Sequence, residues 1–395
     1  MAKPEFNTVV TVPKPRVLEI VDRPFPKLMP GSGSVIIKTE IAALCVDDKM
    51  WTDHDHEWFS HPIYGMGHEG VGVVVDAGTS TKLKDGDRVL ISHGGYCDRC
   101  YSCVNLLCQA MCTNIAGGEV GTSSAPPKFF IDGLAPIERK NDSKSGWAAL
   151  AQYRLADEGT CTIIADDLDF KYAIAAECSV GMAYCAQEFM KVKSGDYLLL
   201  LGNGQRQFSL SNVIVGLFRG ARVIAAVRDD YQAERVLAIG KARGGTPDLH
   251  IVNMRSPDWK DKVLSLTDGN GPEKVADFTS EEEVLNAALD LLCVQGVLYI
   301  QENLYNKNRK LNIDPYAQLA EKNLTITATI DSRHIDRPGI IRMLRNKEVQ
   351  CMWDEVATHE FSLAEVDKAM ELTFTQQCGK VLVYPHGLPR AQGGV

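Results

Sequence analysis

Residues 197–208 read Tyr-Leu-Leu-Leu-Leu-Gly-Asn-Gly-Gln-Arg-Gln-Phe, and they decide the fold of the middle of the chain. The apolar run 197–201 is typical of a strand buried on both faces, and 209–219 has the spacing of a helix. The glycines between them permit a tight turn against a pyrophosphate, although Gln207 stands where a standard fingerprint has its third glycine. We therefore predict a phosphate-binding loop that contains Gly202, Asn203, Gly204 and Gln205.

Apolar runs and helical segments continue to alternate after this loop. Further strands are expected at 222–227, 249–253, 274–278 and 296–301. Continuous apolar strands that alternate with helices imply parallel pairing with both faces of the sheet covered. Residues 179–332 are therefore predicted to form a doubly wound Rossmann domain of the α/β class.

The segments on either side of this domain differ from it in character. Before it, short β-branched runs such as 71–75 alternate with Gly and Asp turns, which predicts a β-rich domain at 1–178. After it, residues 333–395 hold two helical segments and a terminal strand at 380–384. We expect this tail to complete the first domain, so that the Rossmann domain is an insertion.

The composition excludes several classes of function. The 395 residues carry 42 Lys and Arg against 51 Asp and Glu, a formal charge of −9, and no basic run forms a surface for phosphate backbones. No apolar run reaches the ~20 residues needed to cross a bilayer, and the N-terminal residues lack the apolar block of a signal peptide. We expect a cytoplasmic protein that binds neither nucleic acid nor membrane.

Twelve cysteines are more than packing requires, and several fall in one short stretch. Cys97, Cys100 and Cys103 follow one another at three-residue steps, and Cys112 comes later in the same polar segment. A reducing compartment disfavours disulfides, while four thiolates form the tetrahedral site that zinc prefers. We predict a closed structural zinc site at Cys97, Cys100, Cys103 and Cys112, with Cys108 as the alternative fourth ligand.

Several short motifs, taken in order, resemble those of one known group. They are Cys45-Val-Asp-Asp48, Gly67-His68-Glu69-Gly70-Val-Gly72, Gly86-Asp87-Arg88-Val89, the thiol cluster and the closing Gly379-Lys380-Val381. The chain resembles the zinc-dependent alcohol and polyol dehydrogenases of the medium-chain dehydrogenase/reductase superfamily over nearly its whole length. This resemblance implies a GroES-like catalytic domain, a Rossmann domain, a catalytic zinc in addition to the structural one, and a nicotinamide cofactor.

The resemblance also implies which residues hold the catalytic zinc. Cys45 and His68 would be the first ligands, and Glu69 would stand behind them or enter the coordination sphere during turnover. The third ligand of the family comes just before a helix at the domain junction, where this chain offers both Glu177 and Cys178. We expect Cys178, since a soft thiolate matches Cys45, and keep Glu177 as the alternative.

One position departs from the family pattern. Asp47 stands where relatives usually carry the Ser or Thr that relays a proton. An ionised carboxylate near the metal could accept the proton itself, or it could bind an amine or hydroxyls of the substrate. We expect Asp47, Asp48 and Glu69 to form the catalytic group.

The residues after the second Rossmann strand bear on the cofactor. Arg228 could pair with a 2′-phosphate, which favours NADP, whereas the neighbouring Asp229 favours NAD. Relatives assemble through their last Rossmann strand, and the alternating stretch 324–330 could serve in the same way. We expect a homodimer or homotetramer.

Together these features predict a zinc-dependent NAD(P) oxidoreductase that interconverts a secondary alcohol and its ketone. The acidic residues favour a hydroxylated small-molecule substrate of polyol, cyclitol or amino-alcohol type. The altered glycine loop and Asp47 leave an alternative, in which the same fold and zinc catalyse an elimination, epimerisation or hydrolysis without net redox change. A zinc-stabilised binding protein without catalysis would leave the second ligand set unexplained.

Overall fold

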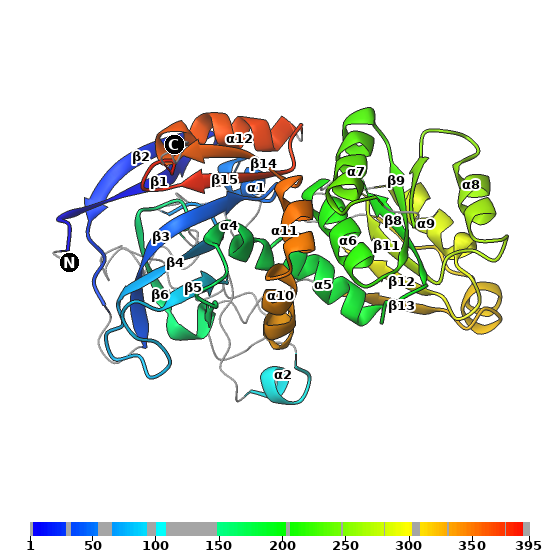
Figure 1. The fold of residues 1–395 in the computed structure, drawn as a ribbon, viewed down its shortest axis with the longest axis horizontal. Coiled ribbons are helices and arrows are strands. Elements are labelled where there is room, and N and C mark those ends of the chain that lie inside the picture. Colours follow the sequence, from blue (N-terminus) through cyan, green and yellow to red (C-terminus); the bar gives the residue numbers. More distant parts are fainter. Residues whose placement is uncertain are drawn as a thin grey trace. The chain divides into compact units, whose positions relative to one another are not determined.

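In the computed structural model the chain forms two compact units (Figure 1). The first contains Met1–Glu177, Arg333–Arg337 and Ala357–Val395, and the second contains Cys178–Ser332 and Pro338–Val356. The residues that the structure describes are 3–28, 33–53, 65–92, 100–107, 148–202, 206–245, 248–279, 281–301, 309–329, 332–375 and 377–389. Within these ranges no helix is both long and apolar enough to cross a membrane.

The first unit is built on a mixed sheet whose strands run in the order β14-β15-β3-β4-β5-β7, with β6 paired to β3. The strands are β3 (Ser34–Leu44), β4 (Glu69–Asp76), β5 (Arg88–Ile91), β6 (Tyr153–Asp157), β7 (Cys161–Ile163), β14 (Ala357–Ser362) and β15 (Lys380–Tyr384). A separate hairpin joins β1 (Phe6–Lys14) to β2 (Val17–Pro24). Alternating β-branched residues such as Val35, Ile37 and Val89 point to one side of the sheet and form its core.

Strand β3 determines where functional side chains gather in this unit. It is antiparallel to all three strands that pair with it, and at its carboxyl end Ala43 lies beside Glu69 of β4 and Leu44 beside Val381 of β15. The carboxyl end of β3 therefore meets the first residues of the two strands that flank it. Short helices accompany the sheet: α1 (Asp48–Asp53), α2 (Tyr101–Val104), α4 (Phe170–Ala173) and α12 (Val366–Thr375).

The second unit is the predicted doubly wound domain. Its strands pair in parallel in the order β10-β9-β8-β11-β12-β13. They are β8 (Tyr197–Gly202), β9 (Arg222–Val227), β10 (Leu249–Asn253), β11 (Lys274–Phe278), β12 (Val297–Ile300) and β13 (Thr325–Ala328). The leucines of β8 are almost fully buried because helices cover the sheet on both faces.

Figure 1 shows α6 and α7 on one face of this sheet and α8 and α9 on the other. The helices are α5 (Val180–Phe189), α6 (Arg206–Phe218), α7 (Asp230–Ala242), α8 (Trp259–Leu266) and α9 (Glu282–Leu291). A short π-helix, Pro315–Ala320, precedes β13. Helix α6 begins three residues earlier than the apolar periodicity predicted, because its first two residues, Arg206 and Gln207, are polar.

One segment joins a different unit from the one expected. Residues 338–356, which hold most of α10 (Arg337–Leu344) and all of α11 (Lys347–Asp354), belong to the second unit instead of completing the first. Helix α11 packs against α6 and α7, and the Arg235 guanidinium contacts the Glu355 carboxylate at 3.2 Å. The apolar face of an amphipathic helix predicts that this face is buried, but it does not predict which part of the protein buries it.

Candidate active site

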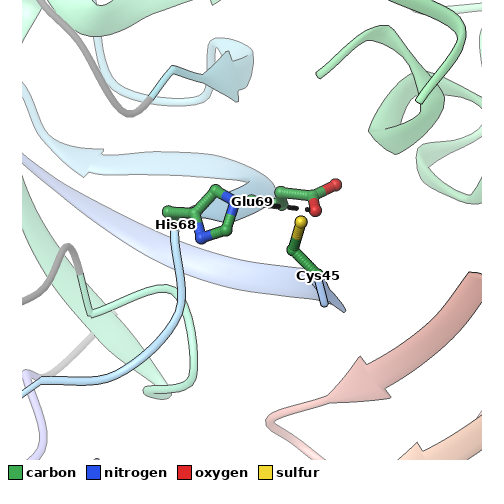
Figure 2. A group of neighbouring side chains, drawn as sticks. All are labelled: Cys45, His68 and Glu69. Atoms are coloured by element: carbon green, nitrogen blue, oxygen red, sulfur yellow. Dashed lines mark ion pairs between the residues drawn. The ribbon is translucent and has the colours of Figure 1, made fainter. Parts of the chain in front are cut away.

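A compact set of metal-binding side chains lies at the carboxyl end of β3. Cys45 follows this strand directly, while His68 precedes β4 and Glu69 begins it. One ligand atom from each lies within 4.8 Å of the other two, and all three residues are buried. Figure 2 shows the thiol, the ring and the carboxylate pointing toward one another. Among the described residues no other group of three or more His, Cys, Asp or Glu could hold a metal ion in this way.

Asp48 orients two of these residues. Its Oδ2 accepts a 2.8 Å hydrogen bond from the backbone N–H of Cys45, and its Oδ1 lies 3.2 Å from Nδ1 of His68. A metal-binding histidine usually turns its other ring nitrogen toward such a carboxylate, which leaves Nε2 for the metal. Burial lowers the pKa of His68, but Asp48 and Cys45 outweigh burial and raise the pKa well above its ordinary value. The site therefore attracts positive charge.

The acidic residues of the group are crowded together. Asp47 is half-buried, and its buried Oδ1 has no hydrogen-bond partner among the described residues. Burial, followed by the charges of Cys45, Asp48 and Glu69, raises the pKa of Asp47 to about 8. Burial likewise raises the pKa of Glu69 to about 7, although Lys380 opposes this rise. A divalent cation among these groups would relieve their mutual repulsion.

Lys380 is a site residue that sequence reasoning missed. It is fully buried at the start of β15, and its ammonium donates a 2.5 Å hydrogen bond to Oε1 of Glu69. The register of the sheet explains the contact, because Val381 pairs with Leu44 and so sets Lys380 beside the end of β3. A lysine at the head of the apolar run 381–383 was the available signal, since a buried lysine is rare unless it is paired.

The donor set suits zinc. Sulfur, imidazole nitrogen and carboxylate oxygen are its usual protein ligands, and a catalytic zinc site leaves one coordination position open. Oε1 of Glu69 lies 3.8 Å from Nε2 of His68, so the carboxylate faces the same space as the thiol and the ring. The residues present therefore fit the metal that the sequence predicted.

The junction residues have different surroundings. Both carboxylate oxygens of Glu177 accept hydrogen bonds from Nη2 of Arg337 at 3.1 Å, and the same guanidinium donates to Ser92 Oγ at 3.0 Å. The Glu177 carboxylate is thus held in a buried ion pair, and among the described residues neither Glu177 nor Cys178 lies in the metal group. Cys178 is buried and is the first residue of the second unit, so its role as third ligand stays a prediction.

The predicted structural zinc site is described only in part. Cys100 and Cys103 flank the first turn of α2, with their sulfur atoms 3.4 Å apart. Cys97, Cys112 and the alternative Cys108 lie outside the described residues. This site also remains a prediction.

The phosphate-loop prediction is described at its two ends. Gly202 ends β8 and Arg206 begins α6, while Asn203, Gly204 and Gln205 lie outside the described residues. A Cβ at Gly202 would lie only 2.5 Å from Cβ of Ser209, so a glycine is required for helix and strand to approach this closely. Ser209 is itself held by Nε2 of Gln232 at 2.9 Å. A small serine on the helix therefore allows close packing without a third glycine.

Charged side chains lie at the carboxyl ends of neighbouring strands in this unit. Arg228, directly after β9, forms an ion pair with Glu281, and burial followed by the charge of Arg255 lowers its pKa. Asp229 caps α7 by accepting a 2.9 Å hydrogen bond from the N–H of Gln232. Nucleotides bind at this edge of doubly wound sheets.

Comparison with known proteins finds the same architecture. Residues 31–165 match the family model described as the alcohol dehydrogenase GroES-like domain. The chain is 26% identical to alcohol dehydrogenase 1 of Artemisia annua, covering 90% of this chain and 91% of that protein. It is 25% identical to L-threonine 3-dehydrogenase of Caldanaerobacter subterraneus, covering 93% and 95%. A solved alcohol dehydrogenase of Escherichia coli, complexed with NADH, superposes with a TM-score of 0.75 at 19% identity, covering 96% of this chain and all of that one.

Proposed function

Because the chain belongs to the zinc-dependent medium-chain dehydrogenase/reductase superfamily, we propose that it interconverts a secondary alcohol and its ketone by hydride transfer. The observation that carries this proposal is the buried group of Cys45, His68 and Glu69. A zinc ion held there would supply Lewis-acid chemistry that eases loss of a hydroxyl proton, and a bound nicotinamide would supply the hydride carrier. Cys45 and His68 would hold the metal, with Cys178 as the proposed third ligand.

The protein's own side chains handle the proton and the orientation. Asp48 Oδ1 lies 3.2 Å from Nδ1 of His68, where its charge would orient the ring with Nε2 toward the metal group. Asp47 is the proposed proton acceptor, since its Oδ1 has no hydrogen-bond partner in the described ranges. A carboxylate two residues from Cys45 stands within the group that would bind the metal, where it could accept the proton of a hydroxyl directly.

The acidic site also selects the substrate. Asp47 places a carboxylate where relatives usually carry a hydroxyl, so the pocket favours a partner with hydroxyl or ammonium donors over a plain aliphatic alcohol. We propose a polyol, cyclitol or amino-alcohol as substrate. The similarity to an L-threonine 3-dehydrogenase supports the amino-alcohol type.

For the cofactor we propose NADP. Arg228 and Arg255 follow adjacent strands and together offer positive charge for a 2′-phosphate. Asp229, the residue that would favour NAD, is already used to cap α7. Glu281 holds Arg228 and would be displaced by the phosphate.

The test combines metal content, cofactor binding and turnover on the purified protein. We expect two zinc ions per chain, fluorescence enhancement of NADPH on binding, and NADP-dependent oxidation of a panel of polyols, cyclitols and amino-alcohols. The Cys45→Ala and His68→Ala variants should retain a single zinc and lose turnover while still binding NADPH.

Two outcomes would change the proposal. Failure to bind NADPH or NADH at millimolar concentration would remove the dehydrogenase reaction. Binding of zinc with turnover of a hydroxylated substrate, but without net change of the nicotinamide, would favour the redox-neutral alternative, in which Asp47 takes a proton from carbon.

A further inference from the structure

Lys380 and Glu69 form an ion pair. The sequence predicted Glu69 as a residue of the metal site, but it did not predict Lys380. Both side chains are completely buried, and they come from strands β15 and β4, on opposite sides of β3. The contact therefore lies at the carboxyl end of β3, which Cys45 directly follows. Any role of Lys380 at this metal site rests on the proposed function, because the metal belongs to that proposal.

The ammonium holds a particular oxygen of Glu69. Oε1, which accepts the 2.5 Å hydrogen bond from Lys380, also lies 3.8 Å from Nε2 of His68. The oxygen nearest to the proposed metal ligand is thus the one that Lys380 occupies. Oε2 is buried without a hydrogen-bond partner among the described residues.

We propose that Lys380 is a positioning residue that competes with the metal for Oε1 of Glu69 and so keeps one coordination position open for substrate. A carboxylate this close to a divalent cation binds it unless another charge satisfies it, and Lys380 is that charge in a place without solvent. Removing the ammonium frees Glu69 to become a ligand. The site then closes and holds its metal more tightly, while substrate loses its position.

The direction in which the rate of metal release changes distinguishes a positioning role of Lys380 from a purely structural role. If Lys380 only stabilised the strands around the site, its loss would loosen the ligands and speed the release of metal. If it holds Glu69 back, its loss slows release. The two roles predict effects of opposite sign on the same measurement.

The experiment replaces zinc by Co²⁺, whose visible absorption reports coordination number, in the full-length protein. The rate at which a chelator removes Co²⁺ is measured for the wild type, Lys380→Met and Lys380→Arg. We expect release from Lys380→Met to be slower by about tenfold, in the range found for residues that contact metal ligands, with a weaker absorption band from the added ligand. Lys380→Arg keeps a cation beside Glu69 and should behave like the wild type.

A second test uses a variant of Glu69. Glu69→Gln alone leaves the buried Lys380 ammonium unpaired beside the metal, so the variants to compare are Lys380→Met and Lys380→Met with Glu69→Gln, neither of which holds that charge. Adding Glu69→Gln to Lys380→Met should abolish the slowing. A double variant that releases Co²⁺ as slowly as Lys380→Met would show that Glu69 does not close the site and would overturn the proposal.

A matched control comes from the second unit, where Arg309 donates a 2.6 Å hydrogen bond to Asp277 and both side chains are as deeply buried. Arg309→Met should lower thermal stability without changing Co²⁺ release. A wild type that binds no Co²⁺ at the Cys45 site would refute the proposed function itself. A wild type that binds it, with Lys380→Met releasing it at the same rate or faster, would refute only the role of Lys380.

Discussion

At the scale of single residues, Asp47 is the position where the sequence departs from the pattern that the family resemblance implies. Its Oδ1 is buried without a hydrogen-bond partner among the described residues, and the charges of Cys45, His68 and Glu69 act on it. If the carboxylate recognises a cation, Asp47→Ser should lower kcat/KM for an amino-alcohol by about 100-fold, since truncating one partner of a buried charge pair costs ~2–5 kcal/mol. Neutral polyols should lose less than about tenfold, because a serine can still relay the proton.

Steady-state kinetics on a paired amino-alcohol and polyol would measure this difference. Asp48→Asn is the neighbouring control: it loses the charge that orients His68, so both substrates should suffer alike through weaker metal binding. Equal losses for the two substrates in Asp47→Ser would show that Asp47 takes no part in recognising an amine.

Arg228 carries the second prediction at this scale. Its guanidinium pairs with Glu281 and lies near the charge of Arg255. Arg228→Ala should weaken NADPH binding by about 10–100-fold, the effect of a hydrogen bond to a charged group worth ~1.5–3 kcal/mol, and leave NADH binding almost unchanged. Fluorescence titration with both nucleotides measures it. Glu281→Gln should tighten NADPH binding, and a variant at either position that shifts both nucleotides equally would argue against the 2′-phosphate.

At the scale of elements, helix α1 positions Asp48 and is anchored at its far end by Asp53. Burial raises the pKa of Asp53, but hydrogen bonds from Lys49 and Arg16 outweigh burial and hold the pKa below its ordinary value. A carboxylate with a lowered folded pKa stabilises the fold above its unfolded pKa of about 3.9 and loses that contribution as pH falls through the folded pKa. Asp53→Asn should therefore destabilise the protein at pH 7 but not at low pH.

The expected loss at pH 7 is only about 0.5–1 kcal/mol, because the side chain of Arg16 is 75% exposed and solvent screens the pair. Urea unfolding at several pH values would measure it, with 1 M salt as a second condition in which the difference shrinks. A loss that persists below pH 3 would mean that Asp53 acts through packing instead of charge.

Some elements and site residues could be predicted from the sequence and others could not, and the difference has physical reasons. Strand β8 and its parallel partners were predictable because a strand buried on both faces must be apolar throughout. Cys45 and His68 were found from spacing and resemblance, and the antiparallel register of β3 and β4 then brings them together. Lys380 was not found, because its partner is distant in sequence and only the pairing of β15 with β3 joins them.

Residues whose surroundings are set by packing were not predictable in this way. Glu177 remained an alternative metal ligand because nothing in the sequence indicates that Arg337 will occupy its carboxylate. Residues 338–356 were assigned to the first domain because an amphipathic helix does not specify the surface that covers it. Local patterns thus predict an element and its buried face, while its partners depend on the whole fold.

At the scale of the whole molecule, the edge of the six-stranded sheet is the feature that bears on assembly. Strand β13 pairs with β12 on one side, and no strand of the described chain covers its other side. The N–H of Thr325 donates inward to Gly296 at 3.0 Å, so by alternation the N–H groups of Ile326 and Ala328 face the open edge. An uncovered edge of this kind is a template for a second copy of the chain.

We therefore expect the protein to form a dimer or tetramer in which two β13 strands pair across a twofold axis. Ala328→Pro removes an edge-facing N–H without breaking a bond to β12, since proline lacks only that donor and is tolerated on an edge strand. Light scattering should give the wild type a multiple of 43.4 kDa and the variant a smaller assembly, with thermal unfolding showing that the fold persists. A wild type that is monomeric at micromolar concentration, or a variant that assembles unchanged, would mean that this edge is protected in some other way.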